Sequence, residues 1–205
     1  MTRGKFVSLE GIDGAGKSTH LNAIAEWIRE RGQAVLVTRE PGGTPLGESL
    51  RQLLLHQSMH PDTEALIMFA ARREHVMQVI APALQQGTWV VSDRFTDASF
   101  AYQGGGRGVD VVHLNYLAAW VEGGIRPDMT LLFDLEPEEA HRRVLRGTPH
   151  PDRFEKEQAT FFRKVRAAYL DRARAEPARF CLLDSSHAPE AIFKQAQQAL
   201  ERLWA

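Results

Sequence analysis

The chain has little of several features that would place it in a specialised class of protein. Its 205 residues include a single cysteine, Cys181, which excludes an intrachain disulfide and favours a reducing compartment. No apolar run approaches the length of a membrane span, and no apolar leader with a small-residue cleavage site opens the chain. The formal net charge is −1, which does not favour non-specific binding to nucleic acid. We therefore expect a cytoplasmic protein that binds neither membranes nor nucleic acid.

The pattern of apolar residues indicates one α/β domain. Short apolar runs alternate with longer helical patterns, and the runs are apolar without strict alternation, as expected for buried parallel strands. This predicts a five-stranded parallel sheet with helices on both faces. The expected strands are 6–9, 34–37, 89–92, 130–133 and 180–183. The expected helices are 20–31, 47–55, 63–86, 110–122, 137–146, 157–175 and 189–204.

A run of glycine stands out in the middle of the chain. Four of the five residues from Gly104 to Gly108 are glycine, more than the end of a helix needs. We expect a mobile or tightly turned loop there, near the functional site.

The segment from Gly11 to Ser18 matches the phosphate-binding pattern G-x-x-x-x-G-K-[ST], and it lies between an expected strand and an expected helix. Glycines let backbone N–H groups turn toward phosphate oxygens, and the helix N-terminus adds a partial positive charge. In such a P-loop, Lys17 neutralises the β- and γ-phosphates and the Ser18 hydroxyl is a ligand for Mg²⁺. We predict an ATP site formed by Gly11, Ile12, Asp13, Gly14, Ala15, Gly16, Lys17, Ser18 and Thr19.

Two expected strands end in a carboxylate that could hold the hydration shell of the metal. They are Asp93, after 89–92, and Asp134, after 130–133. Asp93 is the predicted Mg²⁺ residue, and Asp134 is a second carboxylate nearby.

Arginines at the ends of two strands indicate the nature of the acceptor. A kinase that acts on a hydroxyl benefits from a carboxylate base, whereas a phosphate acceptor is already ionised at pH 7 and needs a positive clamp. Arg39 and Arg94 follow two expected strands, at the edge of the sheet where open α/β proteins bind ligands. A phosphate monoester is therefore the predicted acceptor.

A basic segment at about 142–156 interrupts two helical patterns and is expected to form a lid. Closure of a lid would bring arginines to the transferring phosphoryl group and exclude water. Arg146 and Arg153 are the two residues expected to reach phosphates.

Several motifs in this order make the chain resemble the thymidylate kinase family over nearly its whole length. They are the segments Glu10–Thr19, Thr38–Thr44, Asp93–Phe95, Ala101–Gly108 and Arg126–Asp128. The resemblance implies a P-loop nucleoside monophosphate kinase that converts dTMP to dTDP with ATP and Mg²⁺, for dTTP synthesis. It also implies a homodimer, for which helices 63–86 and 110–122 could supply the contact.

The resemblance further implies roles for residues that bind dTMP. Asp13 matches a residue that contacts the 3′-hydroxyl, and Phe69 matches a ring that stacks on thymine. Ser99 matches a position that contacts the base, and Tyr102 matches a ring that disfavours a 2′-hydroxyl. Arg39 and Arg94 resemble the clamp on the acceptor phosphate, and Arg153 resembles a catalytic lid arginine. The arginine that contacts the base is either Arg72 or Arg73, because two ways of aligning the motif differ by one residue.

Two other functions stay open at this point. One is a kinase for another nucleoside monophosphate or for a deoxynucleoside. The other is a nucleotide-dependent switch protein, because the P-loop pattern alone does not define the acceptor.

Overall fold

A five-stranded parallel sheet forms the centre of the computed structural model, which describes residues 2–147, 152–155 and 157–204, without the side chains of 145–147. The strand order is β2-β3-β1-β4-β5, and every neighbouring pair is parallel. All strands begin and end within two residues of the expected segments, so the predicted sheet is confirmed. The strands are β1 (Phe6–Glu10), β2 (Val35–Arg39), β3 (Trp89–Asp93), β4 (Met129–Asp134) and β5 (Phe180–Asp184).

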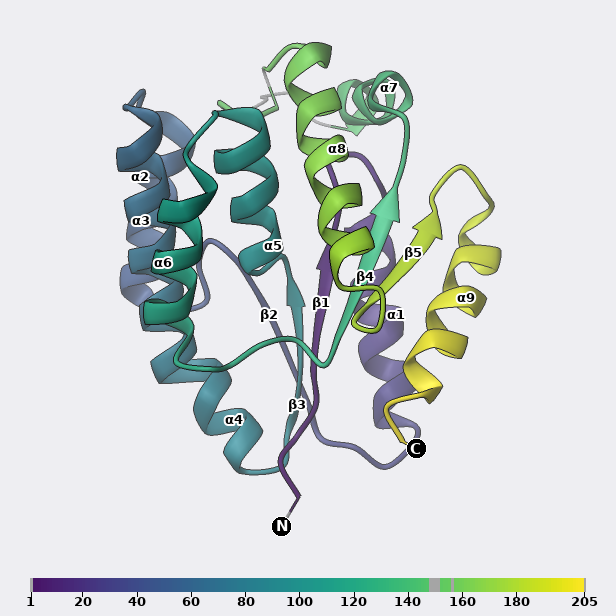
Figure 1. The fold of residues 1–205 in the computed structure, drawn as a ribbon. Coiled ribbons are helices and arrows are strands. Elements are labelled where there is room, and N and C mark those ends of the chain that lie inside the picture. The colour runs from purple at the N-terminus through teal and green to yellow at the C-terminus, as the bar shows by residue number, and fades with distance from the viewer. Residues whose placement is uncertain (1, 148–151, 156, 205) are drawn as a thin grey trace.

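Helices cover both faces of the sheet (Figure 1). Phe6 and Val90 point to one face and pack with Ile80, whereas the adjacent residue Val7 packs with Ile24 on the other face. Because successive side chains point to opposite faces, strands covered on both sides must be apolar throughout. The main helices are α1 (Lys17–Arg29), α2 (Pro45–His56), α3 (Pro61–His75), α4 (Ala81–Gln85), α6 (Val111–Glu122), α7 (Pro137–Gly147), α8 (Ala159–Ala175) and α9 (Pro189–Glu201).

The expected helix 63–86 is interrupted, which corrects the sequence-based prediction. It consists of α3, a π-helical turn η1 (Val76–Ile80) and α4. Pro82 lies in the first turn of α4. Proline has no N–H to donate to the carbonyl four residues earlier, and its ring clashes with that carbonyl, so a regular α-helix does not continue through it.

The glycine run is not a loop, and this expectation was wrong. A short helix α5 (Thr96–Ser99) continues into a second π-helix, η2 (Phe100–Gly106). A Cβ at Gly105 would lie 2.6 Å from Ala168 Cβ, and one at Gly106 would meet the Phe161 ring. These glycines allow η2 to pack closely on α8.

The carboxyl ends of β1, β3 and β4 lie at the same edge of the sheet, where the phosphate loop, Asp93 and Asp134 also lie. This arrangement brings motifs that are far apart in the chain to one site. Among the described residues, no helix is both long enough and apolar enough to cross a membrane.

Candidate active site

The phosphate loop connects β1 to α1 and depends on glycine. Gly11, Gly14 and Gly16 have φ angles of 137°, 81° and 95°, which side chains with a Cβ rarely adopt. The last of these directly precedes α1, so the loop ends on a helix N-terminus. Backbone N–H groups there are free of helical partners and can bind anionic oxygens.

Lys17 is held over this loop by its own backbone. Its Nζ donates to the carbonyl oxygens of Gly11 and Ile12 at 3.0 and 3.1 Å. Burial, followed by the positive charge of Arg94, lowers the pKa of Lys17. An anion in the loop would offset both effects and favour the charged form.

Arg94 forms the centre of a cluster at the end of β3. Its Nη2 donates to Asp13 Oδ1 at 2.7 Å and to the Tyr102 hydroxyl at 3.0 Å, and its Nη1 donates to Gly11 O at 2.9 Å. Its φ of 69° lies in the left-handed region, which is uncommon for a residue with a side chain and occurs often at functional sites.

Asp13 is ionised in this cluster. Burial alone would raise its pKa, but the charges of Arg94 and Lys17 more than offset burial and leave the pKa below its ordinary value. Tyr102 donates its hydroxyl to Asp13 Oδ2 at 2.9 Å. The structure therefore brings the sequence-predicted residues Lys17, Asp13, Arg94 and Tyr102 together.

A cavity opens beside this cluster, which we call the acceptor cavity. Its walls come from the phosphate loop, the loop after β2, α2, α3, α5, η2 and the segment 152–154. It is lined by Asp13, Glu40, Pro41, Arg51, Leu55, Met68, Arg94, Ala98, Tyr102, Gln103, Asp152 and Phe154.

Arg72 lies next to the acceptor cavity with one donor group unused. Its Nε donates to Glu40 Oε2 at 2.7 Å, and its Nη2 donates to Ser99 Oγ at 3.0 Å. Its Nη1 is buried and has no hydrogen-bond partner among the described residues. The guanidinium carbon is 4.6 Å from the centre of the Phe69 ring. Three predicted base-contacting residues, Phe69, Arg72 and Ser99, thus lie together.

Arg73 points elsewhere. It is exposed, and its Nη1 donates to the Val121 carbonyl on α6. Of the two arginines that the sequence left open, Arg72 is the one beside the acceptor cavity.

Gln103 supplies an unused acceptor. Its Nε2 donates to Glu64 Oε1 at 2.8 Å, while its Oε1 is buried and without a hydrogen-bond partner among the described residues. Sequence reasoning missed both residues. Gln103 directly follows Tyr102 in the family motif Ala101–Gly108, so its position beside a predicted site residue could have pointed to it.

The sequence-predicted metal residues suit a magnesium ion. Asp93 Oδ1 is buried and has no hydrogen-bond partner within the described chain, and Ser18 is exposed in the first turn of α1. The described residues hold no group of three His, Cys, Asp or Glu side chains arranged for a metal. Mg²⁺ is commonly held by one or two protein groups together with waters and phosphate oxygens, so this donor set fits. Asp134 instead pairs with Arg166 at 2.7 and 2.9 Å.

Arg39 and Arg51 differ in their position relative to the acceptor cavity. Arg39 pairs with Glu48 at 3.0 Å and does not line the cavity, although the sequence predicted it in the clamp. Arg51 does line it, and its Nη1 donates to Pro41 O at 3.1 Å. Sequence reasoning missed Arg51. Its spacing of three and four residues from Leu54 and Leu55 places it on the same face of an expected helix as these leucines, and this could have drawn attention to it.

Arg153, one of the two arginines expected in the lid, contacts Leu54 and Glu64 in this structure. Arg153 Nε donates to Leu54 O at 3.0 Å, and its Nη2 lies 2.6 Å from Glu64 Oε2. The side chain of Arg146 lies outside the described residues.

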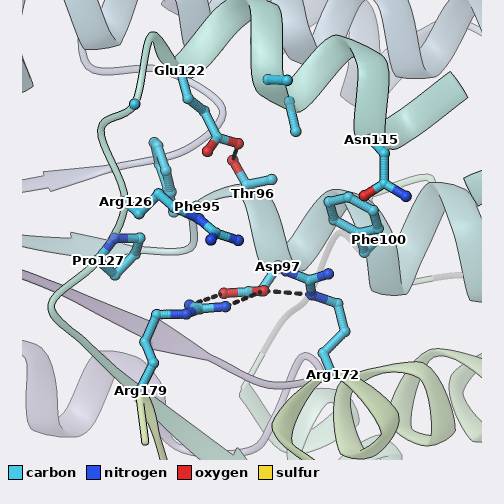
Figure 2. Close-up of a pocket in the computed structure, with 13 residues that line it drawn as sticks. Phe95, Thr96, Asp97, Phe100, Asn115, Glu122, Arg126, Pro127, Arg172 and Arg179 are labelled. Carbon is cyan, nitrogen blue, oxygen red and sulfur yellow. Dashed lines mark hydrogen bonds and ion pairs between the residues drawn. The ribbon is translucent and has the colours of Figure 1, made fainter. Parts of the chain in front are cut away.

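A larger cavity of about 390 Å³ lies on the other side of α5, and we call it the rear cavity. Figure 2 shows Asp97 between Arg172 and Arg179, with shortest distances of 2.6 and 2.7 Å. Burial alone would raise the pKa of Asp97, but the hydrogen bond and charge of Arg179 lower it below its usual value. Glu122 accepts a hydrogen bond from Thr96. Because these charged groups are paired with one another, they hold α5 in place, and none of them needs a ligand as a partner.

Comparison with known proteins agrees with this arrangement. The thymidylate kinase family model matches residues 9–196. A thymidylate kinase of Cupriavidus pinatubonensis is 57% identical, covering 98% of this chain and 100% of the relative, and one of Nitrosospira multiformis is 54% identical, covering 99% and 100%. The crystal structure of thymidylate kinase from Ehrlichia chaffeensis superposes with a TM-score of 0.80 at 31% identity, covering 97% of this chain and 99% of that one. The chain therefore belongs to the thymidylate kinase family.

Proposed function

We propose that the chain transfers the γ-phosphate of ATP to dTMP, giving dTDP and ADP, between the phosphate loop and the acceptor cavity. Family membership supports this reaction. The observation that carries the choice of acceptor is the pair of unused groups beside the cavity, a donor on Arg72 and an acceptor on Gln103.

This pair is complementary to thymine. Thymine carries an acceptor at O4 and a donor at N3–H, which can meet Arg72 Nη1 and Gln103 Oε1. Cytosine has a donor at its N4 amino group and an acceptor at N3, so both contacts would oppose like with like. A buried polar group left unpaired costs about 1–3 kcal/mol, so the mismatch strongly disfavours cytosine. The 5-methyl group of thymine contributes only about 1–3 kcal/mol, so partial use of dUMP is expected.

The sugar and phosphate of dTMP would meet the cluster around Arg94. Asp13 is ionised and can accept a hydrogen bond from the 3′-hydroxyl. Arg94 and Arg51 line the cavity, and Arg39 is close enough to Arg51 to affect its pKa, so these arginines together are the proposed clamp on the acceptor phosphate. Because a phosphate monoester is already ionised, no protein base is required for attack.

On the donor side, we assign the phosphates of ATP to residues 11–19. Lys17 would exchange its two carbonyl partners for β- and γ-phosphate oxygens. Ser18 and Asp93 would hold Mg²⁺, which would supply positive charge to those phosphates.

A single domain with a lid at about 142–156 completes the proposal. Arg146 and Arg153 would stabilise the transferring phosphoryl group. Arg153 can do so only after it leaves Leu54 and Glu64, so the proposal requires movement of this segment.

A homodimer is also part of the proposal. Large apolar side chains on α3 and α6 are half to three-quarters exposed, namely Leu66, Val112, Tyr116 and Trp120. Such an apolar surface is typical of an interface, and a twin chain would cover it symmetrically. Analytical ultracentrifugation should give twice the monomer mass for the wild type, and the monomer mass for Trp120→Lys. The control Leu182→Lys, at a half-exposed apolar residue on β5, should stay dimeric. A monomeric wild type would refute the dimer.

A coupled assay of ADP formation tests the reaction itself. With ATP and Mg²⁺, dTMP should give an acceptor-dependent rate, and its kcat/KM should exceed those of dCMP, AMP, GMP and thymidine by at least about 100-fold. No acceptor-dependent ADP with dTMP, or a better rate with another acceptor, would overturn the proposal.

A further inference from the structure

Glu64 lies beside the acceptor cavity and contacts three side chains, of which Gln103 lines the cavity. It belongs to α3 and is 1% exposed. Its Oε1 accepts the 2.8 Å hydrogen bond from Gln103 Nε2. Its Oε2 faces two guanidinium groups, with Arg153 Nη2 at 2.6 Å and Arg107 Nε at 3.4 Å. One oxygen of the carboxylate thus faces an amide and the other faces two cations.

This arrangement decides which way the Gln103 amide points. The oxygen and the NH₂ group of an amide have nearly the same shape, so a half-turn of the group changes its hydrogen bonding without changing its packing. An ionised carboxylate can only accept hydrogen bonds, so it selects the orientation in which Gln103 Nε2 points to Glu64. The atom left for a ligand is the buried and unpartnered Oε1 of Gln103.

We propose that Glu64 is a positioning residue for acceptor specificity, because its charge fixes Gln103 as a hydrogen-bond acceptor for the N3–H of thymine. Glu64 itself does not line the cavity and acts through Gln103. The inference rests on the proposed function, since it takes the acceptor cavity as the site of the base. Arg107 contributes by keeping Oε2 turned toward itself and Oε1 turned toward Gln103, and Arg153 does the same until it moves to the transferring phosphoryl group.

The substitution Glu64→Gln tests this role at almost constant shape. The introduced amide should turn its oxygen to the two guanidinium groups and its NH₂ to Gln103. Gln103 would then turn its oxygen to the introduced NH₂ and present its own NH₂ to the base. This NH₂ would then face the N3–H donor of thymine without forming a hydrogen bond, whereas it could donate a hydrogen bond to N3 of cytosine.

The measurement is kcat/KM for dTMP and for dCMP in the same coupled assay. Glu64→Gln should lower the ratio of dTMP to dCMP by at least about 10-fold, since a hydrogen-bond match becomes a mismatch. A merely structural role would lower both acceptors by the same factor. A ratio within about twofold of the wild-type value would refute the inference.

A double variant shows whether the effect passes through Gln103. Gln103→Leu removes the amide, so adding Glu64→Gln to it should change the ratio by less than about twofold. A further 10-fold fall in that background would contradict the proposed route. Glu26→Gln is the matched control: Glu26 also lies 2.6 Å from an arginine, but its side chain is 65% exposed, and the ratio should be unchanged.

A measurement on the wild type keeps the inference testable if Glu64→Gln does not fold. The side-chain NH₂ signals of Gln103 in ¹⁵N-labelled protein can be assigned by their loss in Gln103→Leu. Their exchange with solvent should be slow both before and after dTMP is added, because Glu64 holds that NH₂ in both states. Slow exchange that appears only when dTMP binds would overturn the inference. Failure of the wild type to use dTMP would instead refute the proposed function.

Discussion

The two cavities on either side of α5 differ in how their polar groups are satisfied. In the rear cavity, Asp97 is paired with both Arg172 and Arg179. At the acceptor cavity, the buried Oε1 of the lining residue Gln103 and the buried Nη1 of Arg72, which contacts the lining residue Glu40, have no partner within the described chain. The rear cavity is the roomier of the two, yet the unmet hydrogen-bonding capacity lies in the acceptor cavity. Unpaired polar atoms, rather than size, are therefore our reason for proposing the acceptor cavity, and not the rear cavity, as the ligand site.

The largest expected effect on activity comes from Arg72. Arg72→Lys keeps the positive charge beside Glu40 but removes the free Nη1 donor, so kcat/KM for dTMP should fall by about 100-fold. Steady-state kinetics measure the change. The adjacent variant Arg73→Lys is the control and should change kcat/KM by less than about twofold, because Arg73 donates to Val121 instead. The reverse result would assign the base contact to Arg73.

Asp97→Asn tests the rear cavity, where the expected effect is on stability. It leaves two arginines without their carboxylate, so the free energy of unfolding in urea should fall by about 3 kcal/mol, the lower end of the range for a broken buried ion pair. Asp171→Asn is the control. It removes the ion pair between Asp171 and Arg174, whose side chains are 72–75% exposed, and should lower the free energy of unfolding by less than about 0.5 kcal/mol. If Asp97→Asn abolished dTMP kinase activity while leaving stability intact, the rear cavity would be functional rather than structural.

Asp13→Asn should have a smaller effect, confined to recognition of the sugar. The ionised carboxylate is the expected partner of the 3′-hydroxyl, so kcat/KM for dTMP should fall by about 10-fold. With 3′-deoxy-dTMP, which lacks this hydroxyl, the loss caused by the substitution should be clearly smaller. Equal losses with both acceptors would show that Asp13 acts only through Arg94 and Tyr102.

An effect on stability alone, which appears only as pH changes, concerns a link between the two cavities. Burial, and next the charge of Asp97, raise the pKa of Glu10 to about 8 from its ordinary 4.5. Between these two values the folded chain keeps a proton that the unfolded chain loses, so the stability contribution is lost as pH rises from about 4.5 to about 8. The free energy of unfolding of the wild type should therefore fall by about 2 kcal/mol relative to Glu10→Gln between pH 6 and pH 9.

Urea unfolding at several pH values measures this difference, and a parallel pH dependence of the two proteins would contradict it. Asp97→Asn should weaken the dependence, because it removes the nearby negative charge.

Features of the sequence with a local physical cause were predictable. Apolar runs gave the five strands, and the glycines and Lys17 gave the phosphate loop, because both depend on short segments. The glycine run was misread because its purpose is close packing of η2 on α8, a contact between distant segments. The sequence could not choose between Arg72 and Arg73, because two ways of aligning the motif differ by one residue. The packing distinguishes them, since Arg72 contacts Glu40 and Arg73 contacts Val121.

Partners distant in sequence account for the rest. Arg153 was expected at the phosphates, whereas the structure places it against Glu64, which is 89 residues away in the chain. Glu64 and Gln103 belong to no charge pattern that stands out in the sequence. Their role becomes apparent only in the structure, where Gln103 Nε2 is paired with Glu64 and Gln103 Oε1 is buried without a partner among the described residues.

The most direct test of the account compares dTMP with N3-methyl-dTMP as acceptors for the wild-type enzyme. The methyl group removes the one donor that Gln103 Oε1 is proposed to accept, and leaves the phosphate and the 3′-hydroxyl unchanged. The account predicts that kcat/KM falls by at least about 100-fold, as expected for a site built to hydrogen-bond its substrate. Equal use of the two acceptors would show that the unpaired groups beside the acceptor cavity do not recognise the base.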